Sequence, residues 1–267
     1  MLTRVQQSAV QPLESIPFAV RFPTECEFDQ DGEWCELYEG GSWRKLRLHD
    51  YHEIYRVPGL YEHLFSGLLR CTSPQRVVGL LADVMRQDGA LTTELSVLDV
   101  GAGNGLIGEQ LRLIGARKLV GLDLIPEAAE AAGRDRPGLY DDYVVGDLCA
   151  LQPDQVDLLE KASFNALTTV SALGFGDIPP RAFANAVNFI ADDGWLAFNI
   201  RDTFLTGDDS TGFCRLIRAL SSHDVIRIDA YRRYSHRLSV EGQPLHYVAM
   251  VARKLTRVPD ALIDEVE

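Results

Sequence analysis

The sequence predicts an α/β fold, in which a mostly parallel sheet ends in an antiparallel hairpin and follows a small N-terminal extension. From residue 96 onward short apolar strands alternate with helices, a pattern typical of a doubly wound sheet whose strands are buried on both faces. After residue 210 this pattern gives way to one helix and two longer strands. The segment before residue 73 carries turn signals and aromatic residues instead. These observations place an α/β domain behind a separate N-terminal part.

The N-terminal extension, residues 1–72, is expected to contain three parts. Its first 22 residues include two prolines and predict a loose arm. Residues 26–48 hold an Asp-Gly and a Gly-Gly pair between partly alternating segments, which predicts a small β-meander. An aromatic-rich segment follows, and we expect residues 50–65 to close over a ligand as a lid. The alternative is plain core packing, which is typical of aromatic residues at helical spacing such as Tyr55, Tyr61 and Phe65.

The α/β domain is expected to span residues 73–256. Its first helix, 73–87, begins with a serine that can cap it and a proline that suits its first turn. The strands expected next are 96–100, 118–123, 142–147, 164–171 and 195–200. The other expected helices are 105–115, 126–134, 180–191 and 211–222. The last two strands, 225–238 and 244–255, are expected to pair antiparallel, and residues 257–267 to form a solvated acidic tail.

The composition argues against several classes of protein. The chain has 267 residues, of which 46% are hydrophobic, so it can bury a large core. Its formal net charge of -13 argues against wrapping a nucleic-acid backbone, which needs a positive face. Five cysteines without a Cys-x-x-Cys pair predict reduced thiols, no zinc site and a cytoplasmic location. The N-terminus lacks a signal-peptide layout and no run of about eighteen residues is apolar, so we expect no membrane span.

A glycine-rich loop separates the first strand of the sheet from the next helix. Gly101, Gly103 and Gly105 follow the apolar strand before helix-forming residues resume. Because glycine has no Cβ, such a loop can turn tightly and let a nucleotide-like ligand approach the backbone. Two fingerprints overlap here: residues 103–108 match the dinucleotide pattern G-x-G-x-x-G, and residues 99–105 match D-x-G-x-G-x-G. The structural alternative is a tight turn that only packs the helix on the sheet.

Three acids at successive strand ends favour the second fingerprint. Asp99 ends the first strand, where it can orient the loop backbone or reach a cationic amino group through water. Asp123 ends the second strand and can accept hydrogen bonds from both hydroxyls of a ribose. Asp147 ends the third and can accept one from an adenine amino group. The three acids describe a ligand with a ribose, an adenine and a positive charge, but no phosphate. The structural alternatives are a helix cap for Asp123 and an ordinary loop acid for Asp147.

Over about residues 75–255 the sequence resembles the class I S-adenosylmethionine-dependent methyltransferases. The resemblance rests on the glycine motif VLDVGAGNG, the strand ends GLDL and GDL, the segment FNALTTVSALGFGDIPP and the glycine-led strand in DDGWLAFNIRD. It implies a Rossmann-like sheet of seven strands, S-adenosylmethionine as cofactor and S-adenosylhomocysteine as product. The segments SALGFGDIPP and SHRLSVEGQPLHYVAMVARK further resemble the branch of small methyltransferase-like proteins related to the Williams–Beuren region protein.

The resemblance also implies roles for single residues. The glycine loop contacts the methionine part of the cofactor, Asp123 the ribose and Asp147 the adenine. The residues predicted to bind the cofactor are Asp99, Gly101, Ala102, Gly103, Asn104, Gly105, Asp123, Leu124, Asp147, Leu148 and Ser171. Relatives that methylate nucleic-acid amines often carry an Asn/Asp-Pro-Pro-Tyr/Phe motif after the fourth strand. This chain has VSALGFG there, which argues against a base amine as the acceptor.

The predicted function is methyl transfer from S-adenosylmethionine to a small-molecule acceptor, with no metal, nucleic acid or membrane involved. Alignment of the nucleophile with the methyl group supplies much of the rate, so a general base is optional. His49 and Tyr51 are the candidates for a catalytic role, because they precede the core and histidine titrates near neutral pH. Two alternatives stay open: an NAD(P)-dependent oxidoreductase that uses Gly103, Gly105 and Gly108, and a non-catalytic cofactor-binding protein of the same fold.

Overall fold

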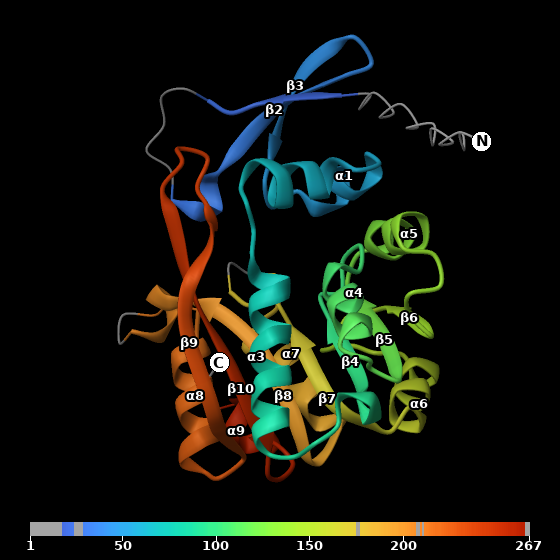
Figure 1. Ribbon diagram of the computed structural model, residues 1–267, viewed down its shortest axis with the longest axis vertical. Helices are drawn as coiled ribbons and strands as arrows, with labels where there is room; N and C mark the ends of the chain where they lie inside the picture. The colour runs from blue at the N-terminus through green and yellow to red at the C-terminus, as the bar shows by residue number, and fades with distance from the viewer. Residues whose placement is uncertain (1–17, 24–28, 175–176, 207–208, 210, 265–267) are drawn as a thin grey trace, which may run out of the picture.

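A seven-stranded sheet forms the centre of the structure, a computed structural model that describes residues 18–23, 29–174, 177–206, 209 and 211–264. Its strand order is β6-β5-β4-β7-β8-β10-β9 (Figure 1). The strands are β4 (Ser96–Val100), β5 (Lys118–Asp123), β6 (Asp142–Val145), β7 (Phe164–Thr169), β8 (Ile190–Arg201), β9 (Ile226–Leu238) and β10 (Pro244–Lys254). β4 to β8 pair in parallel, whereas β10 pairs antiparallel with both β8 and β9. The predicted Rossmann-like sheet with its antiparallel hairpin is confirmed.

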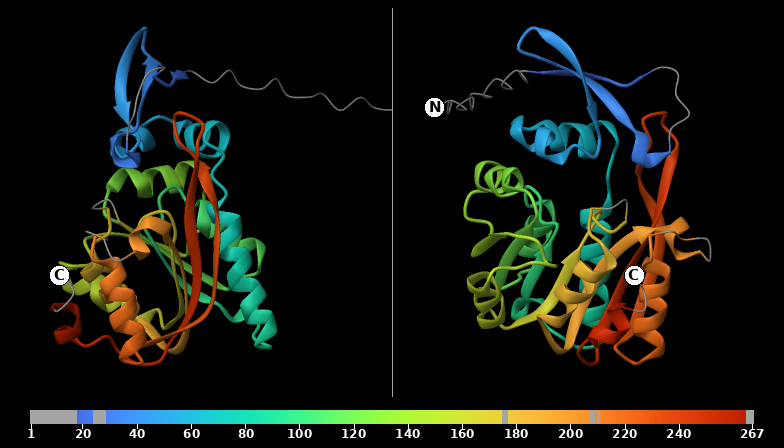
Figure 2. Two further views of the ribbon diagram at one scale, coloured as in Figure 1. Left: turned by 90° about the vertical axis from the view of Figure 1, so that its left-hand side faces the viewer. Right: turned by 180° about the vertical axis from the view of Figure 1, so that it is seen from behind.

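Helices cover both faces of this sheet (Figure 2). They are α3 (Ser73–Gln87), α4 (Leu106–Leu113), α5 (Pro126–Asp135), α6 (Pro153–Lys161), α7 (Pro180–Asn188), α8 (Phe213–Ser222) and α9 (Asp260–Asp264), with 3-10 turns η3 (Thr92–Glu94) and η4 (Asp202–Leu205). Side chains of β4 alternate between the two layers: Leu98 packs with α6, α7 and α8, and Val97 packs with α3 and α4. All five residues of β4 are buried, which explains its continuous apolar sequence.

The order of the strands creates a switch point beside β4. The chain continues from β4 to β5 and β6 on one side, and then returns to place β7 and β8 on the other. In open α/β sheets, ligands bind at the carboxyl ends of the strands at such a point. Val100 at the end of β4 lies in register with Thr169 at the end of β7. The glycine loop and the segment after β7 therefore emerge side by side.

Several expected boundaries differ from the structure. No helix was expected at α6, whose only buried residue is Leu159, so its sequence lacks a broad apolar face. β8 begins at Ile190, five residues before the expected start, and bends where Asp193 adopts a left-handed φ of 59°. The expected solvated tail includes α9, whose Leu262 and Ile263 are buried in the core. An apolar pair within an acidic segment was the sequence signal for that correction.

The N-terminal extension forms a three-stranded antiparallel sheet, of which two strands lie within the expected meander of residues 26–48 and the third lies in the segment expected as a loose arm. Its strands are β1 (Ala19–Arg21), β2 (Trp34–Glu39) and β3 (Ser42–Arg47), with the 3-10 turn η1 (Gln30–Gly32) before β2. The helices α1 (Tyr51–Arg56) and α2 (Leu60–Glu62) and the π-helical turn η2 (His63–Leu68) follow. Figure 1 shows α1 between this sheet and the α/β domain. Most of the expected loose arm, with Pro12 and Pro17, lies outside the described residues, as does Cys26.

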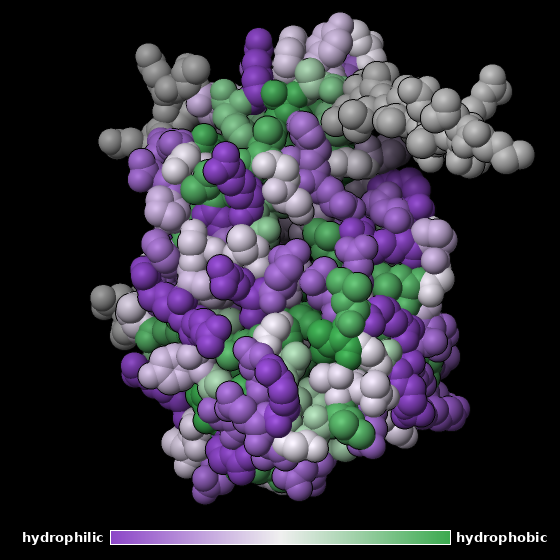
Figure 3. Space-filling view, viewed as in Figure 1, coloured by the Kyte–Doolittle hydropathy of each residue, from purple (hydrophilic) through white to green (hydrophobic). Residues whose placement is uncertain are grey.

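Buried polar contacts attach the extension to the C-terminal hairpin. Arg237 of β9 forms an ion pair with Glu33, and both side chains are almost fully buried. Gln30 Nε2 donates a hydrogen bond of 2.7 Å to the Tyr247 hydroxyl of β10. On the face shown in Figure 3, hydrophilic side chains are spread between smaller apolar areas. The ion pair and the hydrogen bond fix the extension above the carboxyl ends of the parallel strands.

Candidate functional site

A cavity of about 580 Å³, here named the large cavity, lies between α1 and the carboxyl ends of the parallel strands. Its volume is within the range of small-molecule and cofactor sites. Six of the residues predicted to bind a cofactor line it: Gly101, Asp123, Leu124, Asp147, Leu148 and Ser171. The two catalytic candidates, His49 and Tyr51, line it from the N-terminal extension. The fold thus brings together residues that lie far apart in the sequence.

The glycine loop needs glycine for both conformation and space. Gly101, Gly103 and Gly105 have left-handed φ values of 66°, 54° and 93°, which other residues adopt only with strain. A Cβ built on Gly103 would overlap the hydroxyl of Tyr55 and lie 3.2 Å from its Cζ atom. A Cβ on Gly105 would lie 2.7 Å from Leu139. The loop is therefore packed closely on both sides.

A second, smaller cavity of about 40 Å³ adjoins this loop and is named the loop cavity. Ala102, Gly103 and Asn104 line it, so these three predicted residues do not face the large cavity. Tyr55 and Tyr61 line both cavities, and their rings stack with centroids 4.9 Å apart. The tyrosine pair thus forms the wall between the loop cavity and the large cavity. The sequence predicts that residues 50–65 close over a ligand, with core packing as the alternative, and the two tyrosines of this segment line both cavities.

Asp123 connects the end of β5 to the glycine loop. Its Oδ2 accepts a hydrogen bond of 2.9 Å from the Gly103 N–H, and its Oδ1 accepts one of 3.2 Å from the Ile125 N–H. Burial raises the pKa of the Asp123 carboxyl, and these backbone donors oppose that shift. The carboxylate therefore holds the loop while it also lines the large cavity.

The residues after β6 form the far end of the large cavity. Asp147 is exposed, and its Oδ1 accepts a hydrogen bond of 2.8 Å from the Cys149 N–H. Leu148 is buried beside it, and Leu124 after β5 is 58% exposed. Two apolar side chains and one carboxylate at this end fit a flat ring that carries an amino donor.

Asp99 lies near the end of β4, as the sequence predicts, but its side chain faces neither cavity. Its carboxylate is buried beneath the loop, where Oδ1 accepts a hydrogen bond of 2.6 Å from Thr168 and Oδ2 one of 2.7 Å from Tyr140. It lines neither the large cavity nor the loop cavity. Its contacts join β4, β7 and the segment after α5. Burial raises the pKa of Asp99 to about 6.

Replacement of Asp99 by asparagine is expected to change the pH dependence of stability. Because the folded-state pKa is about 6 and the usual value is 3.8, the folded wild type binds a proton more tightly than the unfolded chain. Wild type should therefore gain about 3 kcal/mol relative to the neutral variant as the pH falls from above 6 to below 4. Denaturant unfolding of both proteins at several pH values measures this difference. A difference that does not change with pH would contradict the assignment.

Asn104 acts as a structural connector. The side chain is buried, and its Nδ2 donates to Glu62 at 3.1 Å and to Asp135 at 3.2 Å. Arg136 pairs with the same Glu62 at 2.8 Å. These contacts tie α2 and the end of α5 to the glycine loop. The short helices of the extension are thus held against the loop by charged groups as well as by aromatic packing.

His49 and Asp177 form a pair at the side of the large cavity. The His49 Nδ1 lies 3.4 Å from the Asp177 Oδ2, and the histidine side chain is 11% exposed. Burial raises the pKa of Tyr51 well above its usual value, so this phenol stays protonated at neutral pH. Asp177 was not predicted from the sequence, although it lies in the segment GFGDIPP that follows the fourth strand.

Ser171 holds a strained position at the end of β7. Its φ of 61° lies in the left-handed region, and its N–H donates a hydrogen bond of 2.6 Å to the Asn199 side chain. It lines both the large cavity and the loop cavity. Strained non-glycine residues that neighbouring groups hold in place are concentrated at functional sites. Within the described residues, no cluster of three histidine, cysteine or acidic side chains suits a metal ion.

Comparisons with known proteins agree with this geometry. Residues 98–198 match the model of a methyltransferase domain family. No curated protein matches the sequence. A provisionally assigned sarcosine dimethylglycine methyltransferase from Galdieria sulphuraria is similar in structure, with a TM-score of 0.52, 15% identity, and coverage of 77% of this chain and 100% of that chain. A provisionally assigned RNA methyltransferase from Pyrococcus horikoshii has a TM-score of 0.50, 14% identity, and coverage of 70% and 88%.

The family match and the fold together define the class of this protein. Residues 98–198 carry a methyltransferase domain on a Rossmann-like sheet, the protein is a methyltransferase enzyme, and its cofactor is S-adenosylmethionine. The matched segment contains both overlapping glycine fingerprints, residues 99–105 and 103–108. Among the helices in the described ranges, none has the length and apolar character to cross a membrane.

Proposed function

We propose that this enzyme transfers a methyl group from S-adenosylmethionine to a small-molecule acceptor. One observation carries this proposal: the large cavity lies beneath α1 and has side chains of the extension as its roof. A site that must admit an RNA helix or a protein segment needs an open approach. The formal net charge of -13 also disfavours a nucleic-acid acceptor.

The residues present fit the cofactor. Asp123 would accept hydrogen bonds from the ribose hydroxyls, and Asp147 would accept one from the adenine amino group, with Leu124 and Leu148 against the ring. The glycine loop, with Ala102 and Asn104 on the loop cavity, would hold the methionine part. When bound, the cofactor supplies a methyl group activated by a positive sulfur. The carboxylates that line the large cavity favour such a cation.

The protein would align the acceptor with the methyl group of the cofactor and shield that group from water. Tyr51, Tyr55 and Tyr61 would exclude water from the methyl group, because transfer to water competes with transfer to the acceptor. His49, oriented by Asp177, would take a proton from an acceptor that arrives protonated. The sequence resemblance supports a place in the branch related to the Williams–Beuren region protein. The sparse cysteines of the sequence, without a Cys-x-x-Cys pair, support work in the cytoplasm.

Labelled S-adenosylmethionine tests the class of acceptor. The enzyme is incubated with the cofactor and, separately, with the small-metabolite, RNA and protein fractions of a cell extract. We expect the labelled methyl group in the small-metabolite fraction alone, because side chains of the extension form a roof over the large cavity. Transfer to RNA or protein with none to small molecules would overturn the proposed acceptor class.

Hydrogen exchange tests the predicted lid. S-adenosylhomocysteine should slow amide exchange across residues 50–65 together with residues 101–105, because a ligand that spans the tyrosine wall must order both segments. α8 lines neither cavity and serves as the internal control. If protection changes only at the glycine loop and the acidic strand ends, the extension is scaffold.

A further inference from the structure

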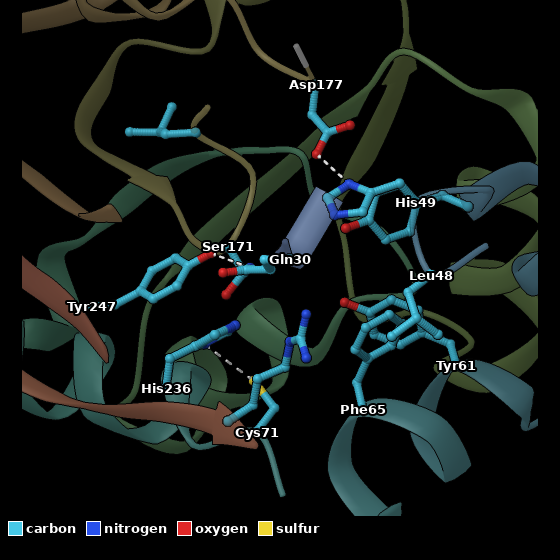
Figure 4. A pocket seen from close by; sticks show the side chains of 13 residues that line it. Gln30, Leu48, His49, Tyr61, Phe65, Cys71, Ser171, Asp177, His236 and Tyr247 are labelled. Carbon is cyan, nitrogen blue, oxygen red and sulfur yellow. Dashed lines mark hydrogen bonds and ion pairs between the residues drawn. The ribbon is translucent and has the colours of Figure 1, made fainter. Parts of the chain in front are cut away.

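A third cavity, named the polar cavity, lies beneath the N-terminal sheet beside the large cavity. Its volume of about 30 Å³ suits a group the size of one or two water molecules. Figure 4 shows Tyr247 and His236 of the C-terminal hairpin on one side, and His49, Tyr61 and Phe65 of the extension on the other. None of the residues predicted to bind the cofactor lines it except Ser171. It therefore lies beyond the cofactor site.

All three cavities meet at the same two residues. Ser171 and Tyr61 line the large cavity, the loop cavity and the polar cavity. The methyl group of the cofactor lies between its adenosine and methionine parts, so the proposed cofactor position puts this group at the junction. The polar cavity therefore shares its lining with the other two next to the point where an acceptor must place its nucleophile.

Gln30 leaves one hydrogen-bond acceptor unused in the polar cavity. The side chain is 5% exposed, and its Nε2 donates to the Tyr247 hydroxyl. Its Oε1 is buried and has no hydrogen-bond partner among the described residues. An unpaired buried carbonyl is costly, and a ligand with a hydroxyl or amino donor would remove that cost.

His236 offers a donor in the same cavity. The Asn199 Oδ1 accepts a hydrogen bond from the Ser171 N–H, which fixes the orientation of the amide. The Asn199 Nδ2 then donates to Ser73 at 3.0 Å and to Tyr234 at 2.6 Å. The Ser73 hydroxyl lies 2.6 Å from both the Tyr234 hydroxyl and His236 Nδ1. Burial, assisted by Arg237, lowers the pKa of His236, so the ring is neutral. When Tyr234 donates to Ser73 and Ser73 donates to Nδ1, the ring proton lies on Nε2.

Arg237 lines the polar cavity together with Asp177 and brings a positive charge to it. Its charge opposes the rise in pKa that burial causes in Tyr51, Tyr61, Cys71 and Tyr247. Glu33 pairs with Arg237, and Asp177 pairs with His49. Asp123 and Asp147 line the large cavity but not the polar cavity, so the positive charge of Arg237 distinguishes the polar cavity.

We propose that the polar cavity binds a carboxylate of the acceptor, next to Arg237 and His236, while a neighbouring hydroxyl or amino group donates to Gln30. The acceptor is then a small hydroxy or amino acid, and its nucleophile lies near Ser171 and Tyr61. This inference rests on the proposed function, because it names the acceptor class of that same site.

Small probes test this subsite on the full chain saturated with S-adenosylhomocysteine, at constant chloride. Ligand-observed NMR measures the binding of glycolate, acetate and glycolamide. Glycolate should bind best, because acetate lacks the hydroxyl that would donate to Gln30 and glycolamide lacks the negative charge that would lie next to Arg237. Gln30→Met should remove the preference of glycolate over acetate, whereas Gln243→Met, at an exposed turn, should keep it. The double variant Glu33→Gln/Arg237→Met should remove the preference over glycolamide without leaving a lone buried charge.

The outcomes separate the two proposals. If the complex with S-adenosylhomocysteine forms but glycolamide binds as tightly as glycolate, the carboxylate subsite is wrong and the proposed function stands. A preference for glycolate over acetate that survives Gln30→Met would also overturn the subsite. Failure of the chain to bind S-adenosylhomocysteine would instead overturn the proposed function. Should the double variant fail to fold, the Gln30→Met comparison alone decides.

Discussion

Replacement of Gly103 by alanine is expected to weaken the binding of S-adenosylhomocysteine by at least about a hundredfold. The residue has a left-handed φ of 54°, where a side chain costs roughly 1–2 kcal/mol. The new Cβ would also overlap the Tyr55 hydroxyl, so either the loop or α1 must move. Both movements disturb the loop cavity, where the methionine part of the cofactor is proposed to bind. Calorimetry with S-adenosylhomocysteine measures the loss.

Two further variants separate the clash from a general loss of stability. Gly133→Ala in α5 has open space around the new Cβ and an ordinary φ, so it should bind the cofactor product as wild type does. Gly103→Ala combined with Tyr55→Phe removes the hydroxyl that the Cβ meets and should recover part of the affinity. Normal binding by Gly103→Ala alone would mean that the loop is only a structural turn.

The strands of the sheet were predictable because burial on both faces makes their sequences continuously apolar. β4 and β5 have the expected bounds, and both are bordered by glycine or acidic residues that end the pattern. α6 was missed for the opposite reason. Its single buried residue, Leu159, leaves no apolar stripe to detect.

The site was predictable where a residue acts directly after a strand. Asp123 and Asp147 line the large cavity because the carboxyl ends of parallel strands meet at one edge. Asp99 is the second-last residue of β4, and its side chain accepts hydrogen bonds from Thr168 and Tyr140 instead of facing a cavity. A position near the end of a strand does not by itself tell which way the side chain points, so the sequence could not separate these cases.

The roof of the site depends on contacts between distant parts of the chain. Tyr55 reaches Gly103 only because α1 packs on α5, where Arg134 donates to the Tyr55 carbonyl and Arg56 pairs with Glu127. No local pattern encodes that packing. The polar cavity likewise needs Gln30 beside Tyr247, which are 217 residues apart in the sequence. Helical spacing of the aromatic residues therefore indicated burial but not the surface that they cover.

The second large effect is expected for Asp123→Ala. The variant removes the acceptor for the Gly103 and Ile125 N–H groups and, in the proposed function, for two ribose hydroxyls. Each hydrogen bond to a charged group contributes about 1.5–3 kcal/mol, so the affinity for S-adenosylhomocysteine should fall by at least about tenfold. Asp142→Ala makes the same charge change on an exposed residue, the first residue of β6, and is the matched control.

A ligand without the 2′-hydroxyl shows whether Asp123→Ala loses affinity through the ribose hydrogen bonds or through the hydrogen bonds to the glycine loop. If Asp123 holds the ribose, wild type should bind the 2′-deoxy form of S-adenosylhomocysteine more weakly than the parent ligand. Asp123→Ala should bind both forms equally, because the partner of that hydroxyl is already gone. If the variant keeps the full preference for the parent ligand, the ribose is held elsewhere. The loss of affinity in Asp123→Ala would then come from the glycine loop. In the described structure the Gly103 N–H donates to the Asp123 carboxylate, and the variant removes that acceptor.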